Sequence, residues 1–538
     1  MRKIVVFLFL VSSFVGFSQE DAWVYFKDKP DSATYLANPL TMLSQRALDR
    51  RTQQNIALDT KDVPIYQPYI NQIATATGIT IKAKSKWFNC VHVRGLQADI
   101  IALKLLSFVD KVDFANRSIN ANKTSSPKYK TKPINKEVKT TTTFSYGNSA
   151  NQIQMLNGHL LHQSNYTGAG KIIAVMDGGF PGVNTAASFS RLRANNQILG
   201  GYDYVNRNTD FYTGIPHGTS VLSLMGGFVD NMLVGTAPDA SYYLFITEDS
   251  TKEEPLEMSN WVEAAEEADR LGVDIITTSL GYTQFDNSNY DFTYNDMNGS
   301  TTFISKGLDI ASSRGMVCVV SAGNEGNQPW YYISAPADAV NALTIGAVKS
   351  DESYASFSSV GPTFDGRIKP DVTAQGQTPF VSDANGNIND TGSGTSYSAP
   401  LIAGMVACLW QALPTKTNQQ IKQLITQSAD KFTAPTAQFG YGIPDFSLAV
   451  ANGLAVTDFE KNEFLLYPNP TKDIVSIALA NGFDKGTIAF YTVLGQKVLE
   501  QNITNSSSVV SLKTLNAGTY FYKIESNGIS KSGKIVKQ

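Results

Sequence analysis

The middle of the chain, from about residue 150 to 455, alternates short apolar runs with segments of helical periodicity. Helices are predicted at Phe303–Ser313 and over the stretch ending at Leu271, where apolar residues recur at helical spacing. Strands buried on both faces are predicted at Ile172–Met176, Asp274–Leu280, Met316–Val320 and Leu343–Val348. Strands that alternate with helices predict an α/β fold, a parallel sheet with helices on both faces.

The regions on either side have different patterns. Residues 19–115 mix strand-like runs with helix-prone stretches and predict a small α+β domain. Residues 116–149 are mostly polar, and Lys, Thr, Ser, Asn and Pro dominate up to residue 143, which predicts a solvated linker. Its six lysines leave an anionic partner open, although a flexible processing segment is the preferred interpretation. Residues 456–538 contain short strand-like runs separated by turn signals, which predicts a small β-sandwich: Ile474–Ala478, Thr487–Thr492, Ser508–Leu512 and Gly518–Ile524.

Length and composition narrow the class of protein. A chain of 538 residues is too long for a single core. The net charge of −3 gives no indication of nucleic-acid binding. Residues 1–18 have a basic start, an apolar core and a small-residue end, as a cleaved signal peptide has, with an uncleaved anchor as the alternative. No other run is long enough for a transmembrane segment. Three cysteines are too few for a disulfide framework, and no Cys/His cluster has zinc spacing.

Candidate chemistry begins at Ser396, in the small-residue turn 392–400 that precedes an apolar run, Leu401–Leu413. This pattern places Ser396 at a helix N-terminus, where free backbone N–H groups face a developing negative charge. An ordinary capping turn is the alternative.

A serine nucleophile needs a base, an orienting carboxylate and an oxyanion donor. Of the four histidines, His217 is the best placed, because it begins a helix-compatible run. Asp177 directly follows a buried strand and precedes two glycines, and Asn324 lies in the turn after another buried strand. Each has a structural alternative, such as a turn-forming aspartate.

These residues occur in the order Asp177, His217, Asn324, Ser396, and the stretches around them resemble those of the subtilisin-like serine peptidases. The resemblance covers roughly residues 150–455. It implies that Ser396 is the nucleophile, His217 the general base, Asp177 the orienting carboxylate and Asn324 the oxyanion donor. It also implies that Ser279, Leu280 and Gly281, together with Ser321, Ala322 and Gly323, bind the substrate, the first three as a strand that pairs with it.

The sequence departs from this family at two positions near the site. Tyr397 stands where the family usually has methionine, and Ser223 stands where a glycine usually follows the histidine motif. Neither change removes a catalytic group, but both put the shape of the cleft in doubt.

The flanking regions resemble parts of exported precursors. Residues 43–51 and 85–89 look like the propeptide of secreted bacterial subtilases, which implies an intramolecular inhibitor, with processing in the linker. The motifs at 467–471, 494–496 and 515–520 resemble the sorting domain of the type IX secretion system. That implies export through both membranes of a Gram-negative bacterium, to the outside or the cell surface. The alternative for this domain is an adhesion module.

The sequence therefore predicts a secreted serine endopeptidase that acts on proteins or peptides, made as a zymogen. The alternatives are a catalytically inactive binding protein or adhesin with the same fold, and an esterase. No cofactor is expected. Structural calcium is possible in such peptidases but is unsupported here, because the loop 227–231 has little carboxylate. The insertion at 282–300, with Asp286, Asp291 and Asp296, is interpreted as a solvated loop.

Overall fold

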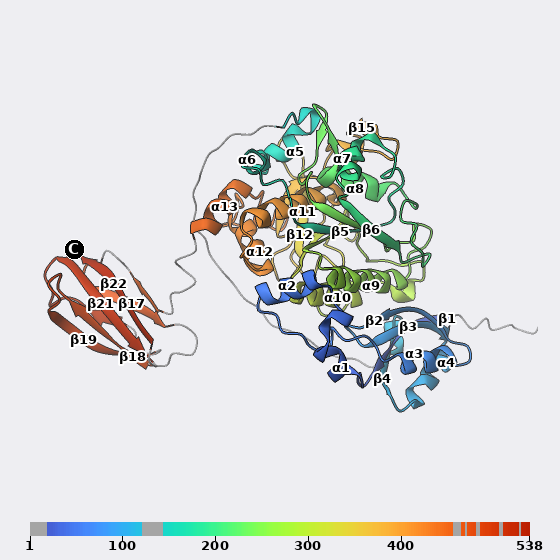
Figure 1. The fold of residues 1–538 in the computed structure, drawn as a ribbon, viewed down its shortest axis with the longest axis horizontal. Coiled ribbons are helices and arrows are strands. Elements are labelled where there is room, and N and C mark those ends of the chain that lie inside the picture. The colour runs from blue at the N-terminus through green and yellow to red at the C-terminus, as the bar shows by residue number, and fades with distance from the viewer. Residues whose placement is uncertain are drawn as a thin grey trace, which may run out of the picture. The chain divides into compact units, whose positions relative to one another are not determined.

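The structure is a computed structural model. It describes residues 19–120, 144–455, 464–467, 471–479, 485–504, 509–526 and 529–538. The predicted signal peptide and most of the predicted linker lie outside the described residues. The chain divides into two compact units, Met1–Asn452 and Gly453–Gln538 (Figure 1).

The centre of the first unit is a parallel sheet of seven strands, in the order β13-β12-β11-β10-β5-β9-β6. The four strands predicted from the sequence are present and fully buried: β5 (Ile172–Asp177), β10 (Ile275–Thr278), β11 (Val317–Ser321) and β12 (Leu343–Val348). Three more were not predicted: β6 (Ile198–Asp203), β9 (Ser241–Ile246) and β13 (Val372–Gln375). β6 is a partly exposed edge strand with two glycines, so its sequence gives little strand signal.

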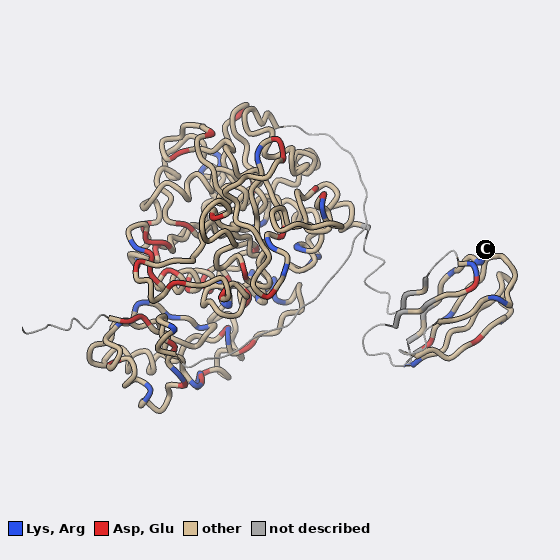
Figure 2. Tube along the Cα trace, turned by 180° about the vertical axis from the view of Figure 1, so that it is seen from behind, with Lys and Arg blue, Asp and Glu red and all other residues tan. Residues whose placement is uncertain are grey.

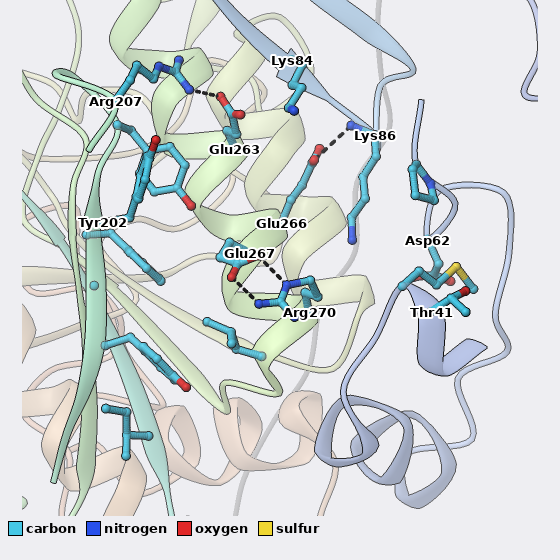
Figure 3. Close-up of a pocket in the computed structure, with 18 residues that line it drawn as sticks. Thr41, Asp62, Lys84, Lys86, Tyr202, Arg207, Glu263, Glu266, Glu267 and Arg270 are labelled. Atoms are coloured by element: carbon cyan, nitrogen blue, oxygen red, sulfur yellow. Dashed lines mark hydrogen bonds and ion pairs between the residues drawn. The ribbon is translucent and has the colours of Figure 1, made fainter. Parts of the chain in front are cut away.

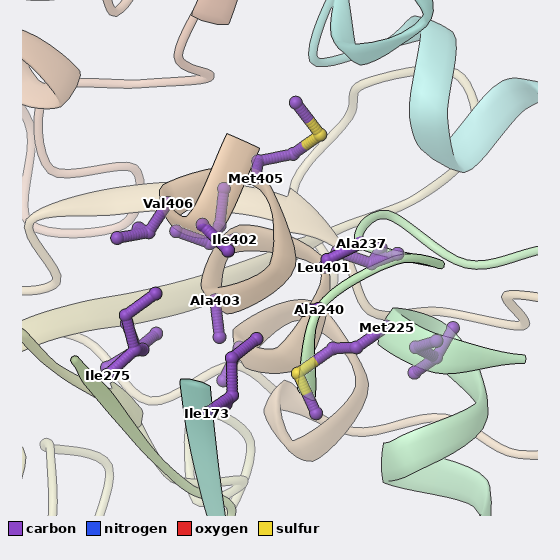
Figure 4. Close-up of a cluster of buried hydrophobic side chains, with 14 of the residues drawn as sticks. Ile173, Met225, Ala237, Ala240, Ile275, Leu401, Ile402, Ala403, Met405 and Val406 are labelled. Atoms are coloured by element: carbon purple, nitrogen blue, oxygen red, sulfur yellow. The ribbon is translucent and has the colours of Figure 1, made fainter. Parts of the chain in front are cut away.

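Helices cover both faces of this sheet, as predicted. On one face lie α8 (His217–Gly226) and α11 (Thr395–Ala412), and on the other lie α9 (Leu256–Leu271) and α10 (Phe303–Ser313) (Figure 1). Alternate residues of β5 enter different cores: Ile173 and Val175 pack with α11, whereas Ala174 and Met176 pack with α9. Figure 4 shows the first of these cores around α11. Smaller helices surround them: α5 (Ala150–Gln154), α6 (Gly158–Gln163), α7 (Ser190–Ala194), α12 (Asn418–Gln427) and α13 (Phe446–Ala455).

Residues 19–120 form the N-terminal domain, an antiparallel sheet in the order β2-β3-β1-β4 with short helices. Its strands are β1 (Gln19–Phe26), β2 (Thr80–Ser85), β3 (Cys90–Leu96) and β4 (Val109–Phe114). Its helices are α1 (Ser32–Ala37), α2 (Gln45–Gln53), α3 (Gln67–Ala74) and α4 (Gln97–Ala102). The predicted α+β character is present, although β4 and α3 had not been expected.

The N-terminal domain packs against α9 and α10 of the central domain, residues 144–455. Trp23 stacks on Phe303 with ring centroids 4.7 Å apart. Arg50 and Arg51, on α2, are both buried and both bind the buried carboxylate of Asp269, with Arg51 Nη2 lying 2.7 Å from Asp269 Oδ2. Figure 2 shows acidic and basic residues gathered along this junction. The interface therefore combines apolar packing with buried charge pairs.

The C-terminal unit consists of two small antiparallel sheets. One contains β16 (Phe464–Tyr467), β17 (Ile474–Leu479) and β20 (Val509–Ser511). The other contains β18 (Lys485–Tyr491), β19 (Lys497–Thr504), β21 (Gly518–Ser526) and β22 (Ile529–Lys537). Their shared core includes Val475, Ile488, Phe490, Ile524 and Ile535. β22 had not been predicted because its three lysines mask the strand pattern.

Candidate active site

The candidate residues collect at the carboxyl edge of the central sheet. β5 ends at Asp177, β10 is followed by Ser279 and β11 by Ala322. The strand register aligns Thr278 with Met176 on one side and with Val320 on the other, so these three ends lie next to one another. Parallel strands bring residues that are far apart in sequence to one edge, which is where the functional residues of such sheets lie.

Asp177 and His217 are in direct contact. The Asp177 carboxylate is fully buried, and its two oxygens lie 2.9 and 3.1 Å from His217 Nδ1. The Gly178 N–H donates to Asp177 Oδ1 at 2.8 Å and fixes the carboxylate. An anionic acceptor at Nδ1 makes this nitrogen the donor and leaves Nε2 to accept a proton. The charge of Asp177 raises the pKa of His217 to about 9, against the opposing effect of burial.

Ser396 is the second residue of α11, as the sequence predicted, and it is half-buried. Asn324 Oδ1 accepts hydrogen bonds from the Thr395 N–H at 2.9 Å and from Thr395 Oγ1 at 3.0 Å. Because the backbone N–H is a donor, these contacts orient the Asn324 amide with its oxygen on Thr395. The Nδ2 group of Asn324 therefore remains able to donate beside the start of α11.

A proline within α11 links the helix to the neighbouring strand. Pro400 has no N–H, so the Ser396 carbonyl four residues earlier has no partner within the helix. Ser279 Oγ donates to this carbonyl at 3.1 Å, and Ser396 Oγ donates to the Ser279 carbonyl at 3.3 Å. The pair of bonds positions Ser396 against the segment Ser279–Gly281. Across the described part of the chain, no hydrogen bond joins Ser396 to His217.

The remaining predicted binding residues lie along the same edge. The segment Ser279–Gly281 leads into an antiparallel bridge between Tyr282 and Ala335, and a Cβ at Gly281 would lie 2.2 Å from Ser334 Oγ. Gly323 has a φ of +108°, a conformation that favours glycine. Its neighbours Ser321 and Ala322 are buried.

The two departures from the family pattern are accommodated differently. Tyr397 lies beside the candidate base, with its ring centroid 6.0 Å from that of His217. Ser223 is buried in α8, where its Oγ donates to the Ser220 carbonyl at 2.7 Å and accepts from the Ser382 N–H at 2.9 Å. Tyr397 therefore lies next to the imidazole of His217, whereas Ser223 connects α8 to the backbone at Ser382.

One group of acidic residues near the site was not predicted from the sequence. The stretch 248–257, here named the acidic loop, follows β9 and contains Glu248, Glu253 and Glu257. Burial and the charge of Asp177 raise the pKa of Glu248 to about 7. A signal existed, since Glu248 and Asp249 closely follow an aromatic run, but β9 itself had not been recognised.

The insertion at 282–300 uses its carboxylates within the protein. Asp291 accepts from the Phe285 N–H at 2.8 Å, and Asp296 binds the Thr293 N–H at 2.7 Å and Arg117. These side chains hold the loop through contacts within the protein. Among the residues that the structure describes, no group of three or more His, Cys, Asp or Glu side chains is arranged to hold a metal ion.

A cavity of about 690 Å³ lies at the junction of the N-terminal and central domains (Figure 3). None of the candidate catalytic residues lines it. Its charged lining residues include the pairs Arg207–Glu263 and Arg270–Glu267. The active-site candidates lie at the carboxyl edge of the sheet. We therefore interpret this cavity as a feature of the domain junction and not as part of the active site.

Three family models match consecutive parts of the chain. The Subtilase family matches residues 159–442, more than half of the chain. The Peptidase S8 propeptide domain of Bacteroidota matches residues 21–132, and the secretion system C-terminal sorting domain matches residues 465–538. These matches confirm the resemblances to a subtilase, its propeptide and a type IX sorting domain. The sorting domain indicates export, with a secreted or cell-surface location. Among the described residues, no helix is long and apolar enough to cross a membrane.

Individual relatives are more distant. Subtilisin NAT of Bacillus subtilis subsp. natto is 29% identical over 281 residues, which is 52% of this chain and 65% of that protein. The subtilisin of Bacillus pumilus is 28% identical over 294 residues, 54% of this chain and 94% of that protein. The solved structure of MycP3 protease from the type VII (ESX-3) secretion system has 20% identity and a TM-score of 0.45, covering 59% of this chain and 92% of that one. With the Subtilase model matching more than half of its length and the predicted parallel sheet at its centre, this chain belongs to the subtilase family.

Proposed function

We propose that this protein is a secreted serine endopeptidase that hydrolyses peptide bonds in proteins through Asp177, His217 and Ser396. The observation that supports this most is the contact between the buried Asp177 carboxylate and His217 Nδ1, at the sheet edge where α11 presents Ser396. Membership of the subtilase family supports the same function. The chain spans 65% of the length of subtilisin NAT. The activity is therefore proposed from the site geometry and the family membership together.

In the proposed reaction, His217 Nε2 removes the hydroxyl proton of Ser396 as Oγ attacks the substrate carbonyl. Asp177 stabilises the imidazolium that results. Asn324 Nδ2 and the Ser396 N–H donate to the oxyanion of the tetrahedral intermediate. The imidazolium then protonates the leaving amine, and the C–N bond breaks to leave an acyl-enzyme. Water, deprotonated by His217, hydrolyses this ester and restores the Ser396 hydroxyl.

The substrate-binding residues have a supporting role in this proposal. Ser279, Leu280 and Gly281 pair with the substrate backbone as an added strand, because the segment continues from the carboxyl end of β10 beside Ser396. Ser321–Gly323 lines the other side of the substrate. No cofactor takes part in the steps above.

We also propose the order of parts in the precursor: a signal peptide at 1–18, a propeptide at 19–115, a linker with the processing site at 116–149, a catalytic domain at 150–455 and a sorting domain at 456–538. The propeptide is proposed to act as an intramolecular inhibitor, and the sorting domain to engage the type IX secretion machinery. The buried pairs between α2 and Asp269 support a propeptide that stays bound until the linker is cut.

The variant Ser396→Ala tests this function. We expect loss of casein hydrolysis and no removal of the propeptide when the full chain is purified without other proteases, as shown by intact mass. A fluorophosphonate probe should label the wild type and not the variant. Wild-type protein that folds, yet neither hydrolyses casein nor reacts with the probe, would instead support an inactive binding protein. Turnover of short acyl esters without turnover of casein would support an esterase.

A further inference from the structure

The carboxyl groups of the acidic loop differ in their partners. Glu257 is buried and accepts the N–H groups of Asp249 at 2.8 Å and Glu254 at 3.2 Å, so it holds the loop in shape. Glu254 is paired with Arg94 at 2.9 Å. In contrast, no described residue makes a hydrogen bond or ion pair with the carboxyl group of Glu248 or Glu253. These two groups are partly exposed and therefore open to a ligand.

Glu248 lies close to the proposed catalytic residues. The Thr247 N–H donates to the Asp177 carbonyl at 3.1 Å, and a Cβ placed on Gly178 would lie 3.7 Å from Glu248 Oε2. The charge of His217 lowers the pKa of Glu248, but burial and the charges of Asp177 and Glu253 raise it more strongly. Burial and Asp286 raise the pKa of Glu253 to about 7. Within the described chain, no lysine or arginine forms an ion pair with either carboxylate.

A second observation at this place is the hydroxyl of Tyr282. Its side chain is completely buried, and its OH group has no hydrogen-bond partner among the described residues. Burial raises its pKa, and the charges of Glu257, Glu248 and Glu253 raise it further. Tyr282 also directly follows the segment Ser279–Gly281. A buried hydroxyl without a partner is costly, so a group that arrives with hydrogen-bond donors would relieve it.

We infer that the acidic loop binds a lysine or arginine side chain of the substrate, in the substrate segment that pairs with Ser279–Gly281, and that Glu248 and Glu253 select it. An ammonium or guanidinium group satisfies both needs, since it neutralises the carboxylates and donates to the Tyr282 oxygen. This inference rests on the proposed peptidase function and adds the class of side chain that the enzyme prefers.

The chain itself carries a substrate of this chemistry. Residues 121–143 contain six lysines and a single acidic residue, Glu137. This stretch joins the N-terminal domain to the central domain, and it is where cleavage of the precursor is proposed. Its charge is complementary to that of the acidic loop, so the preference applies to the first cut as well as to later substrates.

The test uses enzyme that was expressed as the full chain and has then matured. Its substrates are internally quenched peptides that differ only in having lysine, glutamine or norleucine at each position before the scissile bond. At one position we expect kcat/KM to favour lysine over norleucine by about tenfold. In Glu248→Gln and in Glu253→Gln this ratio should fall towards one. The matched control is Glu263→Gln. Glu263 lies on α9, where its carboxylate is paired with Arg207, and this variant should keep the wild-type ratio.

Three outcomes would overturn the inference. The first is cleavage of the norleucine peptides with no preference for lysine at any position, which leaves the proposed function intact. The second is a lower unfolding temperature of the wild type in the presence of a chelator, with no such change in Glu253→Gln. The cluster would then bind a metal ion. The third is no cleavage of any peptide together with no fluorophosphonate labelling, in which case the proposed function fails too. Circular dichroism confirms that each variant is folded.

Discussion

The two ends of helix α9 make an instructive comparison. Towards the C-terminal end, Glu266 and Asp269 face the N-terminal domain, and the Glu266 carboxylate accepts from Ser85 Oγ at 2.5 Å and from the Trp87 N–H at 2.9 Å. Before the N-terminal end, the acidic loop carries Glu248, whose charge acts on His217, and Glu253, and neither carboxyl group has such a partner among the described residues. Folding normally pairs buried charge because unpaired charge is costly. The first end is therefore a completed interface, and the second is prepared for a charge that arrives with the substrate.

The largest expected effect comes from Asp177→Asn, which breaks the buried pair at the catalytic edge. We expect kcat to fall by about 10⁴-fold, because an amide no longer stabilises the imidazolium or fixes its tautomer. The kcat of the wild type and of the variant is measured from the rate of cleavage of an internally quenched fluorescent peptide. A loss smaller than about tenfold would contradict the role proposed for Asp177.

The pH dependence of the same variant sharpens that result. A base works when neutral, so kcat/KM of the wild type should rise with pH and reach half its maximum near pH 9, where His217 loses its proton. Asp177 is the largest cause that raises this pKa, so the midpoint in Asp177→Asn should move to lower pH. If the midpoint is the same in the variant as in the wild type, Asp177 does not set the pKa of His217.

Asp269→Asn tests the completed interface. It leaves Arg50 and Arg51 buried without their shared anion, and we expect a loss of about 3–5 kcal/mol in the free energy of unfolding. Urea denaturation should be measured in the Ser396→Ala background, where the precursor is expected to stay whole. An unchanged midpoint would show that the interface does not depend on this charge.

The smallest effect is expected from Glu263→Gln, which removes a more exposed pair from the same helix. Arg207 and Glu263 lie 2.6 Å apart, with side chains 35% and 15% exposed. Water screens such pairs, so the loss in unfolding free energy should be below about 1 kcal/mol. Comparison with Asp269→Asn then measures how much burial, rather than charge alone, strengthens the junction.

Local pattern was enough to predict much of the fold. Uninterrupted apolar runs predicted β5 and β12 closely, and helical spacing predicted α10. The turn before an apolar run placed Ser396 at the start of α11. β6 and β22 were missed, because glycines in one and lysines in the other conceal the strand pattern. Edge strands are only partly buried, so their sequences are less constrained.

The sequence by itself determined which residue types were available for chemistry and their order along the chain: Asp177, His217, Asn324, Ser396. Only the tertiary structure decided which of them touch. It joined Asp177 to His217, turned the Asn324 oxygen onto Thr395 and left the carboxyl groups of Glu248 and Glu253 without a partner in the part of the chain that the structure describes. The physical reason is that periodicity reports burial along one element, whereas pairing of charges depends on residues that a parallel sheet brings together from distant parts of the chain.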